Sequence, residues 1–354
     1  MKKRASGVLM HITSLPGKQG VGTFGQEAYN FVDFLVETDQ TYWQILPLTT
    51  TSYGDSPYQS FSATAGNTHL IDLELLCKQG YLAKEDYETV NFGDDLENVD
   101  YARIFEARRP ILEKAVAEFM QSADNQKALA EFEKEATWVK DYAEFMAIKE
   151  FFGNKALQEW DDKAVVRREE AALETYREKL KDVITYHKVT QYFFYQQWAD
   201  LKAYANEKGI KIIGDMPIYV SADSVEVWTM PELFKVDAEK TPLCIAGVPA
   251  DSFSDDGQLW GNPIYDWENH KKQITLGGFI VLKRELSSTT FFVSTTLKAS
   301  QIIGKFVGIT RQRMMVVGNL VQDVLCLMLY VTNLANFLLL QKTSVILMPK
   351  PSNC

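Results

Sequence analysis

The C-terminal part of this chain has very few acidic residues and no tryptophan. Residues 273–354 hold two of the 47 acidic residues (Glu285 and Asp323), eight of the 37 basic residues and none of the seven tryptophans. The formal net charge is therefore −16 for residues 1–272 and +6 for residues 273–354. No linker rich in Pro, Gly or Ser separates the two parts, as it commonly does between natural domains. The second part does not have the character of a continuation of the first.

Cysteine is scarce, and its spacing argues against two common kinds of covalent or metal stabilisation. The chain has no Cys-x-x-Cys pair and no Cys/His ligand spacing, since its cysteines lie far apart at Cys77, Cys244, Cys326 and Cys354. Neither a disulfide framework nor a structural zinc site is expected, and a reducing compartment is the default. An export signal is also missing, because the apolar run after the basic start spans only residues 8–10. We therefore expect a cytoplasmic protein.

The chain also lacks a basic stripe, and its pI is about 5.1, so nucleic acid is not expected as a partner. One apolar run, from Leu320 to Leu340, has a single charge at Asp323 and is long enough to span a bilayer. Taken alone it would be a membrane anchor. Because it lies inside the acid-poor part of the chain, we expect no membrane partner.

The first part of the chain carries the pattern of a parallel sheet. Residues 7–11 form a short apolar run, and a helical repeat of apolar residues follows at Ala28, Phe31, Val32 and Leu35. Residues 42–46 then predict a second strand. Strand, helix and strand at this spacing form a βαβ unit, in which the two strands run parallel.

From about 101 to 207 the pattern is helical, rich in Ala, Glu and Lys, and Gly209 is suited to end the last helix. Residues 210–213 then predict a buried strand that ends at Gly214 and Asp215. Barrel enzymes carry binding and catalytic groups at the carboxyl ends of parallel strands. The alternative, to which we give equal weight, is that Asp215 caps the following turn.

Aromatic rings and short polar side chains are combined in the segments 53–67, 214–220 and 247–267. A pyranose has an apolar face that stacks on Trp or Tyr, and a hydroxyl rim that needs Asp, Asn, Gln or Ser as partners. The alternative for any single segment is that its aromatics are core residues and its polar residues form turns. Three such segments at strand-to-helix junctions favour a sugar-binding cleft.

These segments resemble the 4-alpha-glucanotransferases of the amylomaltase type. The matching stretches have the family's order and spacing and lie at 7–17, 43–48, 56–67, 209–220 and 246–267. The resemblance implies an α/β fold in which residues 1–272 form the N-terminal part of a (β/α)8 TIM barrel. The region at about 101–207 would be a helical insertion into that barrel.

The resemblance also implies an activity, the transfer of α-1,4-glucan segments to the 4-hydroxyl of glucose or of a maltooligosaccharide. The mechanism would be a retaining double displacement that uses one nucleophilic carboxylate and one carboxylic acid. No cofactor is expected, because neither step moves electrons or needs a Lewis acid. The substrate-binding residues that the resemblance implies are Ser56, Tyr58, Asp215, Asp251, Trp260 and Asn262.

The resemblance ends after Trp267. The family continues with a strand ending Arg-Ile-Asp-His-Phe, whose Asp is the nucleophile, and later with Ala-Glu-(Asp/Asn)-Leu-Gly, whose Glu is the acid/base. Neither peptide is present. When residues 291–300 are read back by one nucleotide, their codons can encode Phe-Arg-Ile-Asp-His-Phe-Lys-Gly-Phe. Residues 340–345 can likewise encode Ala-Glu-Asp-Leu-Gly. The sequence therefore predicts a frameshift close to Gln273, and no catalytic residue is retained.

On this interpretation residues 273–354 are an out-of-frame tail that is not native-like, and only about three strand units of the barrel remain. Such an open sheet has an unpaired edge. We expect no disproportionation of maltotriose by the chain as written, because the nucleophile and the acid/base act as a unit. Two alternatives stay open, an α-glucan hydrolase of related fold and a non-catalytic sugar-binding or tail-anchored protein.

Overall fold

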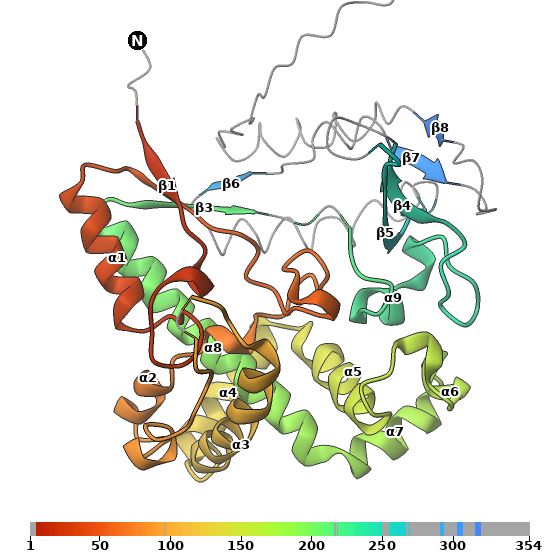
Figure 1. Ribbon diagram of the computed structural model, residues 1–354. Coiled ribbons are helices and arrows are strands. Elements are labelled where there is room, and N and C mark those ends of the chain that lie inside the picture. The colour runs from red at the N-terminus through yellow and green to blue at the C-terminus, as the bar shows by residue number, and fades with distance from the viewer. Residues whose placement is uncertain are drawn as a thin grey trace, which may run out of the picture.

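A parallel sheet lies above a large group of helices (Figure 1). The computed structural model describes residues 5–95, 97–215, 217, 219–249, 255–266 and 269, together with the backbone of 291–293, 303–306 and 316–319. Within this part of the chain no helix is long and apolar enough to cross a membrane. The run from 320 to 340 lies outside the described residues.

The main sheet has the strand order β1-β2-β3-β6, and all neighbouring pairs are parallel. Its strands are short: β1 (Gly7–Leu9), β2 (Tyr42–Gln44), β3 (Lys211–Asp215) and β6 (Phe291–Val293). Helix α1 (Gln26–Glu37) connects β1 to β2. The predicted βαβ unit is therefore confirmed, with strands that end earlier than the predicted limits of residues 11 and 46.

Packing against the sheet explains why α1 is helical where the periodicity predicts it. Ala28, Val32 and Leu35 are fully buried and follow the helical spacing of four and three residues. The central residue of β2, Trp43, is also fully buried, and its indole N–H donates to the carbonyl of Met10 at 2.7 Å. This bond satisfies the one polar atom of the ring inside an apolar core.

The region predicted to be helical is a set of packed helices beneath the sheet. In chain order these are α3 (Tyr101–Phe119), α4 (Ala123–Glu135), α5 (Val139–Phe151), α6 (Lys163–Val166), α7 (Glu170–Lys179) and α8 (Lys181–Glu207). Gly209 follows α8 with a φ of +83°, a left-handed conformation that suits glycine and ends the helix. The long helix α8 runs from this helical group up to the sheet (Figure 1).

Two buried glutamines on α8 attach the chain that follows β2. The amide of Gln191 accepts from Gly66 N at 2.7 Å and donates to Gly66 O at 2.9 Å. The amide of Gln197 accepts from Asp72 N at 2.7 Å and donates to Asp72 O at 3.1 Å. Each side chain thus replaces a backbone partner, and the segment between β2 and α2 (Leu73–Lys78) is fixed on α8.

Trp228, on helix α9 (Val225–Thr229), packs into an aromatic core. Trp228 is fully buried, its ring centroid lies 5.7 Å from that of Phe145 and 6.3 Å from that of Trp160, and its indole N–H donates to Val165 O at 3.0 Å. Trp228 is therefore a core residue that joins α9 to the helical insertion.

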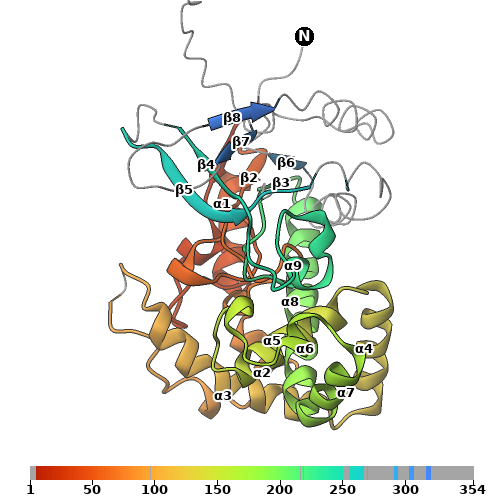
Figure 2. The same cartoon turned by 90° about the vertical axis from the view of Figure 1, so that its right-hand side faces the viewer.

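Two antiparallel pairs make up the other described strands. The hairpin β4 (Ile245–Val248) and β5 (Gln258–Pro263) lies beside the main sheet in Figure 2, and β7 (Ile303–Phe306) pairs with β8 (Val316–Asn319).

The structure differs from the sequence expectation in the number of parallel strands. About three strand units were expected, and β6 from the acid-poor region adds a fourth beside β3. Its residues, Phe-Phe-Val, are of types that favour strands. Within the described residues these four strands do not close into a barrel. The expected domain limit at 272/273 stays a prediction, because most residues beyond it are not described.

Candidate functional site

The carboxyl end of β3 is where three segments that are distant in sequence come together. The segment that follows β2 reaches it through Tyr58 and Gln59, and the segment that follows β3 reaches it through Val220. Strand β5 of the hairpin contributes Asn262. The predicted position of Asp215 as the last residue of a parallel strand is confirmed.

Asp215 is paired with a tyrosine from another segment. Tyr58 Oη donates to Asp215 Oδ2 at 2.7 Å, and the two residues are 157 positions apart in the sequence. Asp215 is 3% exposed and Tyr58 is 40% exposed. Burial, followed by the hydrogen bond to Asp215, raises the pKa of Tyr58 well above its ordinary value. The phenol is therefore a stable donor, and it occupies one of about four acceptor positions of a carboxylate.

Gln59 joins the next part of the site. Its amide nitrogen Nε2 donates to Trp260 O at 3.0 Å and to Asn262 Oδ1 at 3.1 Å. Asn262 is buried, and its own Nδ2 donates to Val220 O at 2.8 Å. One continuous series of hydrogen bonds therefore runs from the segment that carries Tyr58, through β5, to the chain that follows β3.

The other predicted residues have different positions. Ser56 Oγ accepts from Tyr58 N at 3.3 Å, which is a local turn contact. Trp260 donates from its indole N–H to Gln258 Oε1 at 3.0 Å, and its ring is partly exposed. Asp251 lies outside the described residues. The structure thus brings Tyr58, Asp215, Asn262 and Trp260 into one region and places Ser56 in the turn that precedes it.

Aromatic rings surround this region on the side of the hairpin. The ring centroid of Tyr219 lies 6.3 Å from that of Trp260 and 5.9 Å from that of Tyr265, and Phe234 lies 5.3 Å from Tyr265. Tyr219 and Trp260 are partly exposed and can stack on the apolar face of a sugar, whereas Phe234 is buried in the core. The combination of such rings with a buried carboxylate and a buried amide is what a pyranose needs from its site.

A second carboxyl group, that of Glu226, contacts the other end of the segment that carries Tyr58. Glu226, in the first turn of α9, is 7% exposed, and its Oε1 accepts from Ala63 N at 2.9 Å and from Ser62 Oγ at 3.1 Å. Burial raises the pKa of Glu226 to about 7. This group therefore changes its charge near neutral pH, unlike an ordinary surface glutamate.

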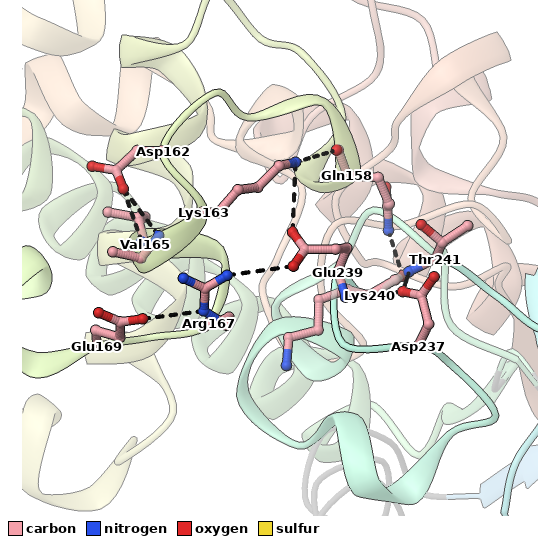
Figure 3. A network of polar contacts seen from close by, with 11 residues as sticks. Gln158, Asp162, Lys163, Val165, Arg167, Glu169, Asp237, Glu239, Lys240 and Thr241 are labelled. Atoms are coloured by element: carbon pink, nitrogen blue, oxygen red, sulfur yellow. Dashed lines mark hydrogen bonds and ion pairs between the residues drawn. The ribbon is translucent and has the colours of Figure 1, made fainter.

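A more exposed polar network joins residues 237–241 to the helical insertion. Figure 3 shows Lys163 and Arg167 pointing toward Glu239, with nitrogen–oxygen distances of 3.7 and 3.4 Å. The amide of Gln158 also donates to Lys240 O at 2.9 Å. The Glu239 side chain is 40% exposed. This network attaches a surface turn to the helical insertion.

The positions that the sequence connects with the family's catalytic motifs lie mostly outside the described residues. The positions whose shifted codons can encode the nucleophile and the acid/base motifs lie in 291–300 and 340–345, and only the backbone of 291–293 is described. Within the described residues, no group of three or more His, Cys, Asp and Glu side chains could hold a metal ion.

Comparison with known proteins gives this site its context. A family model described as 4-alpha-glucanotransferase, of glycoside hydrolase family 77, matches residues 10–277, which is more than half of the chain. The chain belongs to this family. The match ends within five residues of the change in composition at 273.

Curated members of the 4-alpha-glucanotransferase family match the same part. The 4-alpha-glucanotransferase of Streptococcus pneumoniae is 61% identical over 272 residues, which are 76% of this chain and 53% of that protein. The Clostridium butyricum protein of the same name is 50% identical over 259 residues, 73% of this chain and 53% of that protein. The chain therefore spans about half the length of the curated relatives it matches.

A solved family structure has a similar fold. The amylomaltase from Streptococcus agalactiae in complex with acarbose has a TM-score of 0.91 and 59% identity, and the match covers 95% of this chain and 68% of that one. This similarity supports the assignment of the four parallel strands to part of a family 77 barrel.

Sequence reasoning missed two residues that organise the site. Gln59 lies between Tyr58 and Ser60, and Glu226 lies on a helix of only five residues. The partners of Gln59 are at least 201 positions away and those of Glu226 in the segment of Tyr58 at least 163, so no local pattern identifies either residue. The signal that was available was chemical: Gln59 stands beside an aromatic residue and could have been counted among the sugar-like polar groups.

Proposed function

We propose that the described part of the chain is the maltooligosaccharide-binding portion of a 4-alpha-glucanotransferase, and that the chain as written binds α-1,4-glucans without transferring them. The observation that carries the proposal is the family match over residues 10–277, which ends where the charge of the chain changes sign. The Tyr58–Asp215 pair and the surrounding aromatic rings support it, because they offer both kinds of contact that a pyranose needs.

The proposed glucan contacts are made by residues at the end of β3 and on β5. Asp215 would accept hydrogen bonds from sugar hydroxyls while Tyr58 holds one of its oxygens. Asn262 would contribute its amide, and Trp260 would offer a ring face to the apolar side of a glucose unit. The loop that contains Asp251 would lie on the acceptor side, and Ser56 would support the turn before Tyr58.

Transfer requires two more groups. In a retaining transfer, a carboxylate bonds to the anomeric carbon as the glycosidic C–O bond breaks, and a carboxylic acid gives its proton to the leaving oxygen. The 4-hydroxyl of the accepting sugar then forms the new C–O bond with the anomeric carbon as the bond from that carbon to the carboxylate breaks, and it gives its proton to the acid/base group. We infer that the codons for both groups are out of frame after about Gln273, which would leave residues 1–272 as the glucanotransferase portion and residues 273–354 as an unrelated tail.

The sequence and the relatives also bear on where such a protein works. The scarcity of cysteine supports a cytoplasmic protein, and the family match supports maltooligosaccharides and glucose as its partners. The names of the relatives favour the transferase over an α-glucan hydrolase. Longer oligosaccharides formed from maltotriose would distinguish the two activities in any preparation that shows turnover.

One preparation tests the proposal with two readouts. The chain is purified, its intact mass is matched to the 354 residues, and it is titrated with maltoheptaose and incubated with maltotriose. We expect saturable binding and no glucose release above background. Glucose release by the mass-verified chain would refute the loss of transfer, and absence of binding would refute the sugar site. Sequencing of the DNA across codon 273 tests the frameshift separately, since an intact frame that encodes the same tail would contradict it.

A further inference from the structure

The segment 58–64 carries Tyr58 and Gln59 toward the end of β3, and its other end is bound to α9. Glu226 Oε1 accepts from Ala63 N at 2.9 Å and from Ser62 Oγ at 3.1 Å. Beside it, Val225 N donates to Phe61 O at 2.9 Å. Three successive residues of the segment are therefore bonded to two successive residues of α9.

Hydroxyl groups stiffen the segment between these two ends. Ser60 Oγ donates to Ser62 O at 2.6 Å and lies 2.9 Å from Thr50 Oγ1. Ser62 Oγ also accepts from Thr64 N at 3.0 Å and from Ala65 N at 3.1 Å. Three residues thus separate Tyr58 from Ser62, and the chain between them is fixed by buried hydrogen bonds that leave it little freedom to move.

Helix α9, which carries Glu226, is itself bound to the helical insertion. Three residues before it, Asp223 forms an ion pair with the buried Lys149 at 2.5 Å and accepts from Leu157 N at 3.0 Å. Two residues after it, Trp228 donates to Val165 O at 3.0 Å. The helical insertion therefore holds α9 in place, and the hydrogen bonds of Glu226 hold the segment 58–64 on α9.

A carboxyl group at position 226 costs free energy on burial. Glu226 is buried, its hydrogen bonds to Ser62 and Ala63 come from uncharged donors, and its Oε2 has no hydrogen-bond partner within the described residues. Burying such a group costs free energy that an apolar residue of similar size would not. What the carboxyl group supplies is an acceptor for two donors at once, which determines the position of the segment.

We propose that Glu226 is a positioning residue for sugar binding, which holds the segment 58–64 on α9 so that the Tyr58 hydroxyl stays on Asp215. This inference rests on the proposed function, because it takes the Tyr58–Asp215 pair as a glucan contact. Glu226 itself touches no sugar on this proposal. Its effect on binding passes through Tyr58.

The test compares four variants of the full chain by titration with maltoheptaose: Glu226→Ala, Glu226→Gln, Tyr58→Phe and the double variant Glu226→Ala/Tyr58→Phe. We expect Glu226→Ala to weaken binding about tenfold and the double variant to bind no more than about twofold more weakly than Tyr58→Phe, since coupled residues are not additive. Glu226→Gln keeps an acceptor for Ser62 and Ala63 and should retain most of the affinity. Equal losses from Glu226→Ala in both backgrounds would overturn the proposal.

Glu144→Ala is the matched control. Glu144 is as buried as Glu226 and is bonded to Arg177, but it lies on α5 and has no hydrogen bond to the segment 58–64. We expect this variant to lose stability and to keep its affinity for maltoheptaose. A loss of affinity equal to that of Glu226→Ala would mean that general destabilisation explains both.

Hydrogen exchange separates this inference from the proposed function. Glu226→Ala should raise the exchange of peptide amides in 58–65 and leave those of α4 and α7 unchanged. If the wild-type chain binds no maltoheptaose but exchange rises as expected, the positioning holds and the proposed function fails. If exchange in 58–65 does not change, the positioning fails. Should Glu226→Ala not fold, Ser62→Ala removes one of the two donors, and it should raise exchange in the same peptides and weaken binding.

Discussion

Two glutamates that lie 13 positions apart attach the chain after β3 in opposite ways. Glu226 is buried against uncharged donors from the segment that carries Tyr58, whereas Glu239 is 40% exposed and pairs with Lys163 and Arg167 of the insertion (Figure 3). Exposed ion pairs contribute little to stability because water and salt screen them. The stability that a buried carboxyl group with uncharged partners contributes depends on whether that group is ionised. We therefore expect the stability contributed by Glu226 to depend on pH and the stability contributed by Glu239 to depend on salt concentration.

The largest expected effect is the pH dependence due to Glu226. Its pKa is about 7 in the folded chain against an ordinary value of 4.5, so the folded state holds more protons between these values. The free energy of unfolding should therefore fall as pH rises from about 4.5 to 7, by about 3 kcal/mol from this group, and stay level above. Urea unfolding of the wild type and of Glu226→Gln across this range measures the difference. A difference that does not vary with pH would contradict the raised pKa.

Removal of the side chain gives the next effect. Glu226→Ala leaves Ser62 Oγ without one of its partners and deprives Ala63 N of this acceptor. At pH 5, where the carboxyl group is neutral, we expect a loss of about 2 kcal/mol in the free energy of unfolding. Chemical denaturation measures it, with Glu239→Ala as the comparison. If Glu239→Ala costs as much as Glu226→Ala, the contrast between the two attachments is wrong.

Gln59→Ala should have a smaller effect on stability. It removes the hydrogen bonds to Trp260 O and Asn262 Oδ1, for an expected cost of about 1 kcal/mol. Because the same bonds hold β5 beside Tyr58, maltoheptaose affinity should also fall. Thermal unfolding and titration on one preparation check both. Unchanged affinity would show that β5 keeps its place without Gln59.

The smallest effect on stability is expected for the network around Glu239. Glu239→Gln should lower the free energy of unfolding by less than about 1 kcal/mol, because the pairs with Lys163 and Arg167 are partly exposed. The loss should shrink as the ionic strength rises from 0.05 to about 0.5 M, since the Debye length falls well below 10 Å. Unfolding curves at the two salt concentrations provide the measurement. A loss that is independent of salt would count against an electrostatic attachment.

The elements with strong local patterns were predictable from the sequence. The apolar spacing of α1, the helical region from Tyr101 to Glu207 and the strand that ends at Asp215 all follow from periodicity and end signals. The limits of β1 and β2 were less predictable, since strands of three residues depend on their neighbours. The fourth strand, β6, was missed because residues 291–293 lie in a region that was not expected to continue the sheet.

The internal geometry of the site was not predictable in the same way. Tyr58 and Asp215 were each identified from their segments, but their contact joins residues 157 positions apart. Gln59 and Glu226 act through hydrogen bonds that form only once the hairpin, α9 and the loop after β2 have packed together. Packing makes Trp228 a fully buried core ring and leaves Trp260 partly exposed, a difference that depends on the whole fold.

Titration of the mass-verified chain with maltoheptaose, beside its Asp215→Asn variant, tests the central claim most directly. Asn keeps the size of the side chain and removes the charge that favours hydroxyl donors. The account predicts saturable binding by the wild type and an affinity lower by about tenfold or more in Asp215→Asn, which corresponds to about 1.4 kcal/mol or more. Equal affinities of the two proteins would contradict a glucan site at the end of β3.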